Sequence, residues 1–270
     1  MKRLISVLFL FLLAISTSYC YGQVLGKQSE LNALAECYVK SFDEFIQRFN
    51  AEEIPAFVRT DSVEDVRYRC IVALFDLEQV NDTNSKEARR MLKFASNVCD
   101  NNTYLHITSP GIYAEAHCAF KYKKKDIDLN LILSFESRHD DYYNWVLRSA
   151  NGVKEAGLVD TVFRGRINPV NNELHFSELS SAFPHMNSFV SKHHELDMLS
   201  YLAGMAESGM LLYESCQSIT YYITQVPGYV FTVTQHSRRS MNSGYLIQDL
   251  IEIDDKDKDY YVYKLLGGEL

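Results

Sequence analysis

GIYAEAHCAFKYKKKDIDLNLILSF, residues 111–135, contains two alternating stretches on either side of a cluster of lysines. In the first stretch, apolar or small residues occupy every second position: Ile112, Ala114, Ala116, Cys118 and Phe120. In the second, the apolar positions are Ile127, Leu129, Leu131, Leu133 and Phe135. A period of two residues is typical of a β-strand with one buried face. The stretch therefore predicts two strands of an antiparallel sheet.

The lysine cluster predicts the turn of this hairpin at Lys124-Lys125. In that register Lys121 faces Asp128, so that opposite charges stabilise the polar face. The alternation continues at 143–147, which predicts a third strand, and residues 162–167 can supply a fourth.

The segments before the hairpin have the period of helices instead. Apolar residues recur every three or four positions, with charged residues between them, which predicts amphipathic helices over 29–49, 61–77 and 85–99. The second and third begin with residues that suit an N-cap, Ser62 and Ser85. The sequence thus predicts an α+β fold in which N-terminal helices cover the apolar face of an antiparallel sheet.

A turn cluster, Asn168 to Asn172, is the best candidate for a boundary in the middle of the chain. We therefore predict a domain over 23–168 and a smaller α+β region over 169–270, for which a second related domain is one interpretation. The elements expected in this region are helices at 177–183 and 188–213, and strands at 219–225, 229–235, 245–253 and 260–265.

The N-terminal residues have the order of a secretory signal peptide, with two bases, an apolar run over 4–15, then small and polar residues. The run is shorter than the roughly 20 apolar residues that span a bilayer. Gly22 suits the last position before a cleavage site, so residues 1–22 are expected to be removed. Lipid anchoring at Cys20 is the disfavoured alternative, because the bulky Tyr19 precedes it. We expect an exported protein, periplasmic or extracellular, that is not integral to the membrane.

The charge of the chain argues against a nucleic-acid partner. The full chain has 27 basic and 35 acidic residues, a net charge of −8, and removal of the leader takes away two more bases. A nucleic-acid binder presents a basic patch that neutralises phosphates. We therefore expect no nucleic acid among the partners.

Five cysteines remain after cleavage: Cys37, Cys70, Cys99, Cys118 and Cys216. No CxxC pair occurs among them, so the sequence gives no sign of a zinc site or a dithiol redox motif. The pattern favours buried free thiols and leaves open one disulfide, whose pairing the spacing does not define.

Two polar constellations are weak candidates for a site. Glu115 and His117 share one face of a predicted strand, where an acid/base pair is one interpretation and an ordinary solvent-facing surface the favoured one. His193 and Asp197 lie one helical turn apart and are candidate metal ligands, but Met198 stands where a zinc-protease helix has its second histidine. A solvated cluster is the favoured interpretation, and we expect neither a metal nor a cofactor.

The first helix carries a recognisable pattern. FDEFIQRFNAEE, residues 42–53, resembles the opening helix of NTF2-like proteins, and NWVL, residues 144–147, is similar to one of their late strands. The resemblance covers residues 29 to about 168 and extends to exported NTF2-like proteins of unknown role in Bacteroidetes. It implies a cone of helices packed on a curved sheet. That fold hosts both enzymes and binding modules, and the catalytic constellation of its isomerases does not map onto this sequence.

We interpret the chain as an exported, non-enzymatic binding or interaction module whose partner is a small apolar ligand or a protein. Phe42, Ile127 and Trp145 are the expected lining of an apolar ligand pocket. Two alternatives remain: an NTF2-like enzyme that performs acid/base chemistry on a small apolar substrate, and a component of a surface or secretion system.

Overall fold

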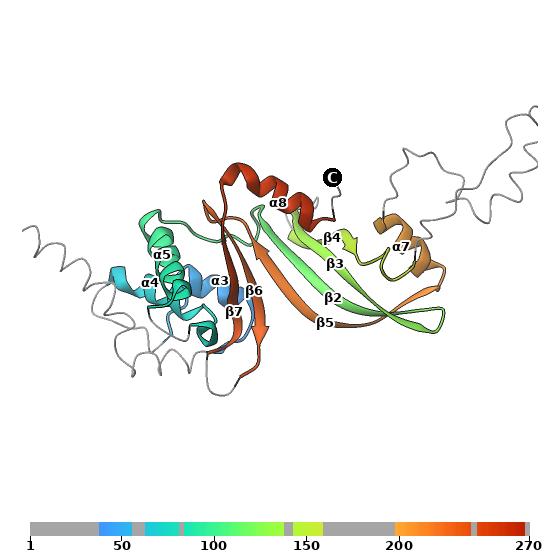
Figure 1. Cartoon of the computed structure of the whole chain (residues 1–270), viewed down its shortest axis with the longest axis horizontal. Helices are drawn as coiled ribbons and strands as arrows, with labels where there is room; N and C mark the ends of the chain where they lie inside the picture. The colour runs from blue at the N-terminus through green and yellow to red at the C-terminus, as the bar shows by residue number, and fades with distance from the viewer. Residues whose placement is uncertain are drawn as a thin grey trace, which may run out of the picture. The chain divides into compact units, whose positions relative to one another are not determined.

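The computed structural model describes residues 38–55, 63–80, 84–137, 143–158, 198–238 and 242–267. Figure 1 labels their helices and strands. The strands are β1 (Tyr38–Val39), β2 (Ile112–Tyr122), β3 (Lys125–Ser137), β4 (Tyr143–Asn151), β5 (Leu211–Ile223), β6 (Tyr229–His236) and β7 (Ser243–Glu252). The α-helices are α3 (Phe42–Phe49), α4 (Val63–Ala73), α5 (Lys86–Asp100), α7 (Met198–Glu207) and α8 (Lys258–Leu265). Two 3-10 helices, η2 (Leu77–Gln79) and η4 (Asp255–Asp257), complete the described elements.

The described strands form one seven-stranded sheet in the order β1-β7-β6-β5-β2-β3-β4. Strand β6 pairs antiparallel with both β5 and β7, whereas the short β1 pairs parallel with β7. The predicted α+β class is therefore confirmed. The sheet takes strands from both sides of residue 168.

The chain divides into two compact units. The first comprises the described residues within Met1–Glu115, Ser134–Val146 and Ser218–Tyr263, and the second those within Ala116–Leu133, Leu147–Gln217 and Lys264–Leu270. Over the described ranges, no helix combines the length and the apolar composition that a membrane crossing requires.

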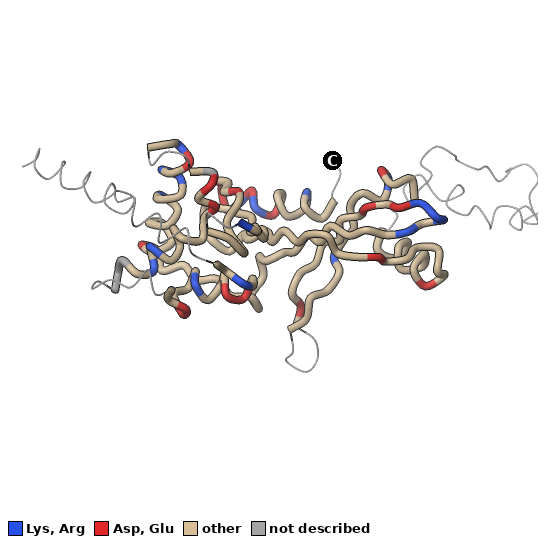
Figure 2. The backbone as a smooth tube through the Cα atoms, turned by 90° about the horizontal axis from the view of Figure 1, so that it is seen from below, with Lys and Arg blue, Asp and Glu red and all other residues tan. Residues whose placement is uncertain are grey.

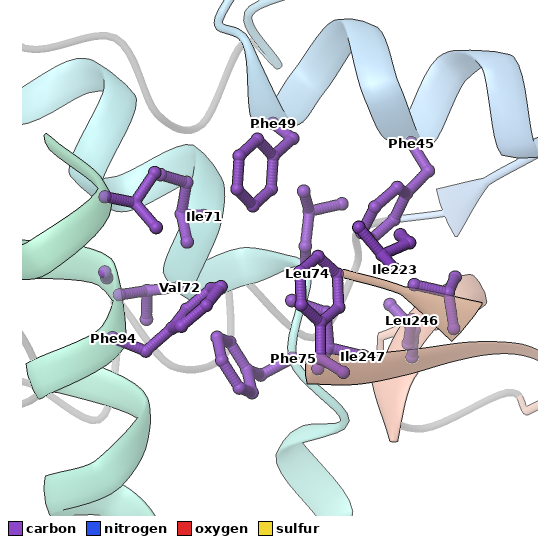
Figure 3. Close-up of a cluster of buried hydrophobic side chains, with 14 of the residues drawn as sticks. Phe45, Phe49, Ile71, Val72, Leu74, Phe75, Phe94, Ile223, Leu246 and Ile247 are labelled. Atoms are coloured by element: carbon purple, nitrogen blue, oxygen red, sulfur yellow. The ribbon is translucent and has the colours of Figure 1, made fainter. Parts of the chain in front are cut away.

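The core of the first unit lies between helices α3 to α5 and strands β5 to β7 (Figure 1). Figure 3 shows side chains of the three helices directed toward those of the strands. The largest fully buried side chains of this core are Phe45, Phe49, Phe94, Phe231, Ile71, Leu74, Met91, Leu105, Ile223 and Leu246. Burying such side chains contributes about 1.5–3 kcal/mol each relative to leaving them exposed, so this core is the main source of stability in the unit.

Helices α3 and α5 begin at serine N-caps. The hydroxyl of Ser41 accepts from the main-chain N–H of Glu44 at 3.1 Å, and that of Ser85 accepts from Ala88 at 3.0 Å. The start of the third predicted helix at Ser85 is confirmed, as are its inward residues, Ala88, Met91, Leu92, Ala95 and Val98. The predicted helix over 29–49 is wrong where Tyr38–Val39 forms a strand, and residues 29–37 lie outside the described residues.

The short strand β1 pairs with β7 at a position where only glycine fits. Val39 lies opposite Gly244, whose φ is +92°. A Cβ atom built on Gly244 would stand 1.9 Å from the carbonyl oxygen of Val39. The glycine at the start of β7 therefore allows the close approach of β1, because any side chain at this position would push β1 away.

The predicted hairpin of β2 and β3 is present, but its register differs. The two turn residues are Lys123 and Lys124, with φ values of +47° and +69°, as a two-residue type I′ turn requires. Lys121 consequently lies near Asp126, with Nζ 3.5 Å from Oδ1, and the predicted pairing of Lys121 with Asp128 is wrong. Moving the turn by one residue shifts every cross-strand pair by two.

Two predicted elements of the C-terminal region are corrected. The helix expected over 188–213 is helical only at Met198–Glu207 within its described part, because Gly209 adopts a φ of +71° and ends it. The strand expected over 260–265 is the helix α8. The predicted helix at 177–183 and strand at 162–167 lie outside the described residues.

Candidate functional site

Five aromatic rings form a contiguous row in the first unit, called the aromatic row below. Phe42 of α3 stacks on Tyr221 of β5, with ring centroids 3.7 Å apart and planes 4° from parallel. Tyr221 also lies 6.1 Å from Trp145 of β4 and 6.0 Å from Tyr245 of β7. Trp145 contacts Phe135 of β3 with centroids 4.0 Å apart. One helix and four strands thus each contribute one ring.

The aromatic row runs from the core to the surface. Phe42 is 6% exposed and Trp145 is 36% exposed, while Phe135, Tyr221 and Tyr245 are half-buried. The buried end is fixed by its packing in the core, and the indole at the other end keeps surface in contact with solvent. A row of this kind is a rigid apolar surface on which a further ring can stack at low cost in conformational entropy.

The structure brings two of the three predicted pocket residues into one cluster. Phe42 and Trp145 both contact the ring of Tyr221. Ile127 is half-buried in β3 and belongs to the second unit. Sequence reasoning missed Tyr221 and Tyr245, although both occupy alternating positions of strands that it had predicted.

A second group of polar side chains includes Glu115. The hydroxyl of Tyr222 donates to Oε2 of Glu115 at 2.6 Å, and the hydroxyl of Thr232 donates to Asp249 at 3.2 Å. Burial raises the pKa of Tyr222, and the hydrogen bond and charge of Glu115 raise it further. The pKa of Tyr261 is raised by burial first and then by the charges of Asp249 and Glu115. Both phenols are therefore protonated at neutral pH.

The other candidate site residues proposed from the sequence do not form a common site within the described residues. His117 Nδ1 lies 2.7 Å from Oδ1 of Asn130, whereas Glu115 binds Tyr222, so the two members of the predicted pair have different partners. His193 and Asp197 lie outside the described residues. Within the described part of the chain, no group of three or more His, Cys, Asp or Glu side chains is arranged to hold a metal ion.

A network of charged and polar side chains joins the end of β6 to the residues after α4. Arg238 donates through both terminal nitrogens to the carboxylate of Asp76, with Nη2 2.8 Å from Oδ2, and its Nε lies 3.0 Å from Glu78. Nη2 also donates to Nδ1 of His236 at 2.8 Å. Nε2 of His236 lies 2.8 Å from the hydroxyl of Thr234. Because Nδ1 accepts a hydrogen bond, the His236 ring is neutral and carries its proton on Nε2.

The pKa values of this network follow from burial and charge. The pKa of His236 is lowered, chiefly by burial. The Asp76 carboxylate raises this pKa, the Arg238 charge lowers it, and the Glu78 charge raises it. For Asp76, burial alone would raise the pKa, but the hydrogen bond and charge of Arg238 outweigh burial and lower it. Figure 2 shows basic and acidic positions interspersed along the described chain.

We expect the free energy of unfolding to fall as the pH drops below about 6.5, the usual pKa of an unfolded histidine. His236 binds its proton less readily in the folded protein, so its contribution is fully present above that pH and is lost as the pH falls toward the lowered pKa. Urea unfolding between about pH 5 and pH 8 measures the effect. The variant His236→Gln should flatten this part of the pH dependence, and the exposed His106→Gln should not. An unchanged pH dependence in His236→Gln would contradict the assignment.

Comparison with known proteins adds no relative to this geometry. No protein-family model matches the chain, and no curated protein or solved structure is significantly similar to it. The function must therefore be argued from the residues themselves.

Proposed function

We propose that the chain is an exported binding module that holds a small, flat, apolar ligand on the aromatic row. The observation that carries this proposal is the continuous series of ring contacts from the buried Phe42, which stacks on Tyr221, to the partly exposed Trp145, which is tilted against Tyr221. Export is supported by the leader-like order of the first 22 residues. The NTF2-like class is likewise a proposal, supported by the phenylalanine-rich helix α3 against an antiparallel sheet.

Ring stacking favours a planar ligand over a flexible one. Each aromatic contact adds about 0.5–1.5 kcal/mol beyond the burial of apolar area. A bicyclic ligand that removes about 300 Å² of apolar surface from water gains about 7 kcal/mol. Lost translational and rotational freedom offsets several kcal/mol of this gain, so we expect dissociation constants in the micromolar to millimolar range.

The polar group around Glu115 favours binding over acid/base catalysis. A catalytic acid or base works best with a pKa near the operating pH. The pKa of Tyr222 is instead raised further from neutrality, and its hydroxyl keeps its proton while donating a hydrogen bond to Glu115. The contact acts as a hydrogen bond between β5 and β2, two neighbouring strands of the sheet.

Trp145 makes the proposal directly testable, because it is the only tryptophan in the chain. Selective excitation of tryptophan therefore reports from the exposed end of the aromatic row. We expect N-phenyl-1-naphthylamine, a neutral naphthalene dye, to quench Trp145 saturably through energy transfer. The variant Tyr221→Ala removes the ring between Phe42 and Trp145 and should weaken dye binding about tenfold.

A matched control is Tyr260→Ala, which removes an exposed ring on α8 outside the aromatic row. It should bind the dye like the unmodified protein. Circular dichroism establishes that each variant is folded before titration. A Trp145 signal that does not saturate, or equal affinity in folded Tyr221→Ala, would overturn the proposal.

A further inference from the structure

Two cysteine side chains of the second unit are in contact across neighbouring strands. Cys118 lies on β2 and Cys216 on β5, and these strands are adjacent in the sheet. The Cys118 thiol hydrogen-bonds to the Cys216 thiol. Facing residues on neighbouring strands have Cα atoms about 4.5–5.5 Å apart, within the range that a disulfide spans.

Neighbouring contacts hold the two strands together beside this pair. The rings of Phe120 and Tyr213 meet edge to face with centroids 5.7 Å apart. Lys121 Nζ lies 3.0 Å from Oε1 of Glu214. Each contact joins a residue of β2 to one of β5 within three positions of the cysteines. The thiols therefore meet without a rearrangement of the backbone.

The two thiols differ in their access to solvent. Cys118 is 2% exposed, whereas Cys216 is exposed. Burial first, and then the charge and hydrogen bond of the neighbouring Cys216, raise the pKa of Cys118 to about 11. Because the thiolate is the reactive form, Cys118 does not readily attack reagents dissolved in the solvent. Cys216 is the thiol that a dissolved reagent reaches first.

We propose that Cys118 and Cys216 form a modification site, which a small disulfide such as oxidised glutathione converts into an intramolecular disulfide between β2 and β5. This inference is independent of the proposed ligand site, since it uses no residue of the aromatic row. It assigns the two cysteines opposite roles: Cys216 is the attacking residue and Cys118 the resolving one.

The reaction takes place in two exchange steps. The Cys216 thiol loses its proton to solvent, and its thiolate attacks one sulfur of oxidised glutathione, forming a mixed disulfide and releasing one glutathione thiolate. Cys118 then loses its proton, and its sulfur attacks the Cys216 sulfur, which breaks the mixed disulfide and releases the second glutathione. In total, two protein thiols are oxidised to one disulfide, and one oxidised glutathione is reduced to two molecules of glutathione.

Mass spectrometry of the full chain after incubation with oxidised glutathione tests the proposal. The unmodified protein should lose two hydrogens and give a peptide that links Cys118 to Cys216. Cys118→Ser should stop at the first step, with one glutathione bound to Cys216. Cys216→Ser should give neither product at these two positions. Cys99→Ser, which removes a half-buried thiol at the end of α5, should react like the unmodified protein.

The linkage should also raise the unfolding temperature. The disulfide closes a loop of about 100 residues, for which we expect a rise of about 10 °C in the oxidised over the reduced protein. Cys216→Ser should show no such rise. The proposal fails if Cys216 of the unmodified protein stays unreacted or keeps its glutathione, or if the linked peptide pairs Cys118 or Cys216 with another cysteine. These readings on the unmodified protein do not depend on the folding of any variant.

Discussion

Replacing Phe94 with alanine should lower the free energy of unfolding by about 4 kcal/mol. The Phe94 side chain is fully buried and contacts four other rings. Its ring centroid lies 5.1 Å from that of Tyr229, 5.4 Å from Phe231, 5.7 Å from Phe75 and 6.3 Å from Phe49. Alanine removes all four contacts and leaves a cavity between α5 and the strands. The cavity cannot collapse, because the surrounding rings are already closely packed.

Urea denaturation followed by circular dichroism measures this loss. Phe94→Leu retains much of the volume and should lose less, about 1–2 kcal/mol. The exposed Tyr263→Ala, on α8, is the control for removal of an aromatic ring and should lose about 0.5 kcal/mol or less. A loss below about 1.5 kcal/mol for Phe94→Ala would contradict the central place given to this ring.

Replacing Asn242 with alanine should lower the free energy of unfolding by about 3 kcal/mol. The side chain is fully buried and binds three main-chain groups of another segment. Nδ2 donates to the carbonyls of Ala73 at 3.0 Å and Phe75 at 2.5 Å, and Oδ1 accepts from the N–H of Leu77 at 3.3 Å. Alanine leaves these groups buried without this partner, which is more destabilising than the loss of an exposed hydrogen bond.

The same unfolding experiment tests Asn242→Ala. Asn101→Ala is the matched control, because Asn101 is exposed and donates one hydrogen bond to the carbonyl of Asn97 at 2.9 Å. It should lose less than about 1 kcal/mol. An equal decrease in the free energy of unfolding for the two variants would show that the three buried hydrogen bonds of Asn242 stabilise the fold no more than one exposed hydrogen bond does.

Local rules predicted the elements whose burial and capping agree. Helix α5 begins at Ser85 as predicted, because an N-cap and a helical period of apolar residues coincide there. Strand β2 alternates between buried and half-buried residues from Ile112 to Phe120, as its sequence does. Each of these elements buries one face only, so the periodicity of the sequence reflects the burial directly.

The wrong predictions concern segments in which the sequence pattern does not reflect burial. Helix α8 contains a run of aromatic and β-branched residues over 260–263, types that are typical of a strand, yet none of its side chains is buried. Its start is set instead by acids such as Asp255, Asp257 and Asp259, which favour the N-terminal end of a helix. Apolar residues around Leu211 continued the pattern of α7, although Gly209 had already ended that helix.

Part of the candidate site could be predicted from the sequence. Phe42 and Trp145 were proposed as pocket residues, but the ring between them was not. Tyr221 and Tyr222 are adjacent on β5, and alternation alone does not say which tyrosine faces the helices. The stack with Phe42 decides it, and that contact joins residues 179 positions apart in the chain.

The parallel pairing of Tyr38–Val39 with Ser243–Gly244 has a consequence for folding of the chain during its synthesis on the ribosome. At about 5–20 residues per second, roughly 10–40 s separate the synthesis of the two partners. During that interval β1 has no strand to pair with, and the phenylalanines of α3 lack the surface that β7 provides. The nascent chain therefore carries exposed aromatic residues until its last strand emerges, which makes this stage the one at which a chaperone or an aggregation partner competes with folding.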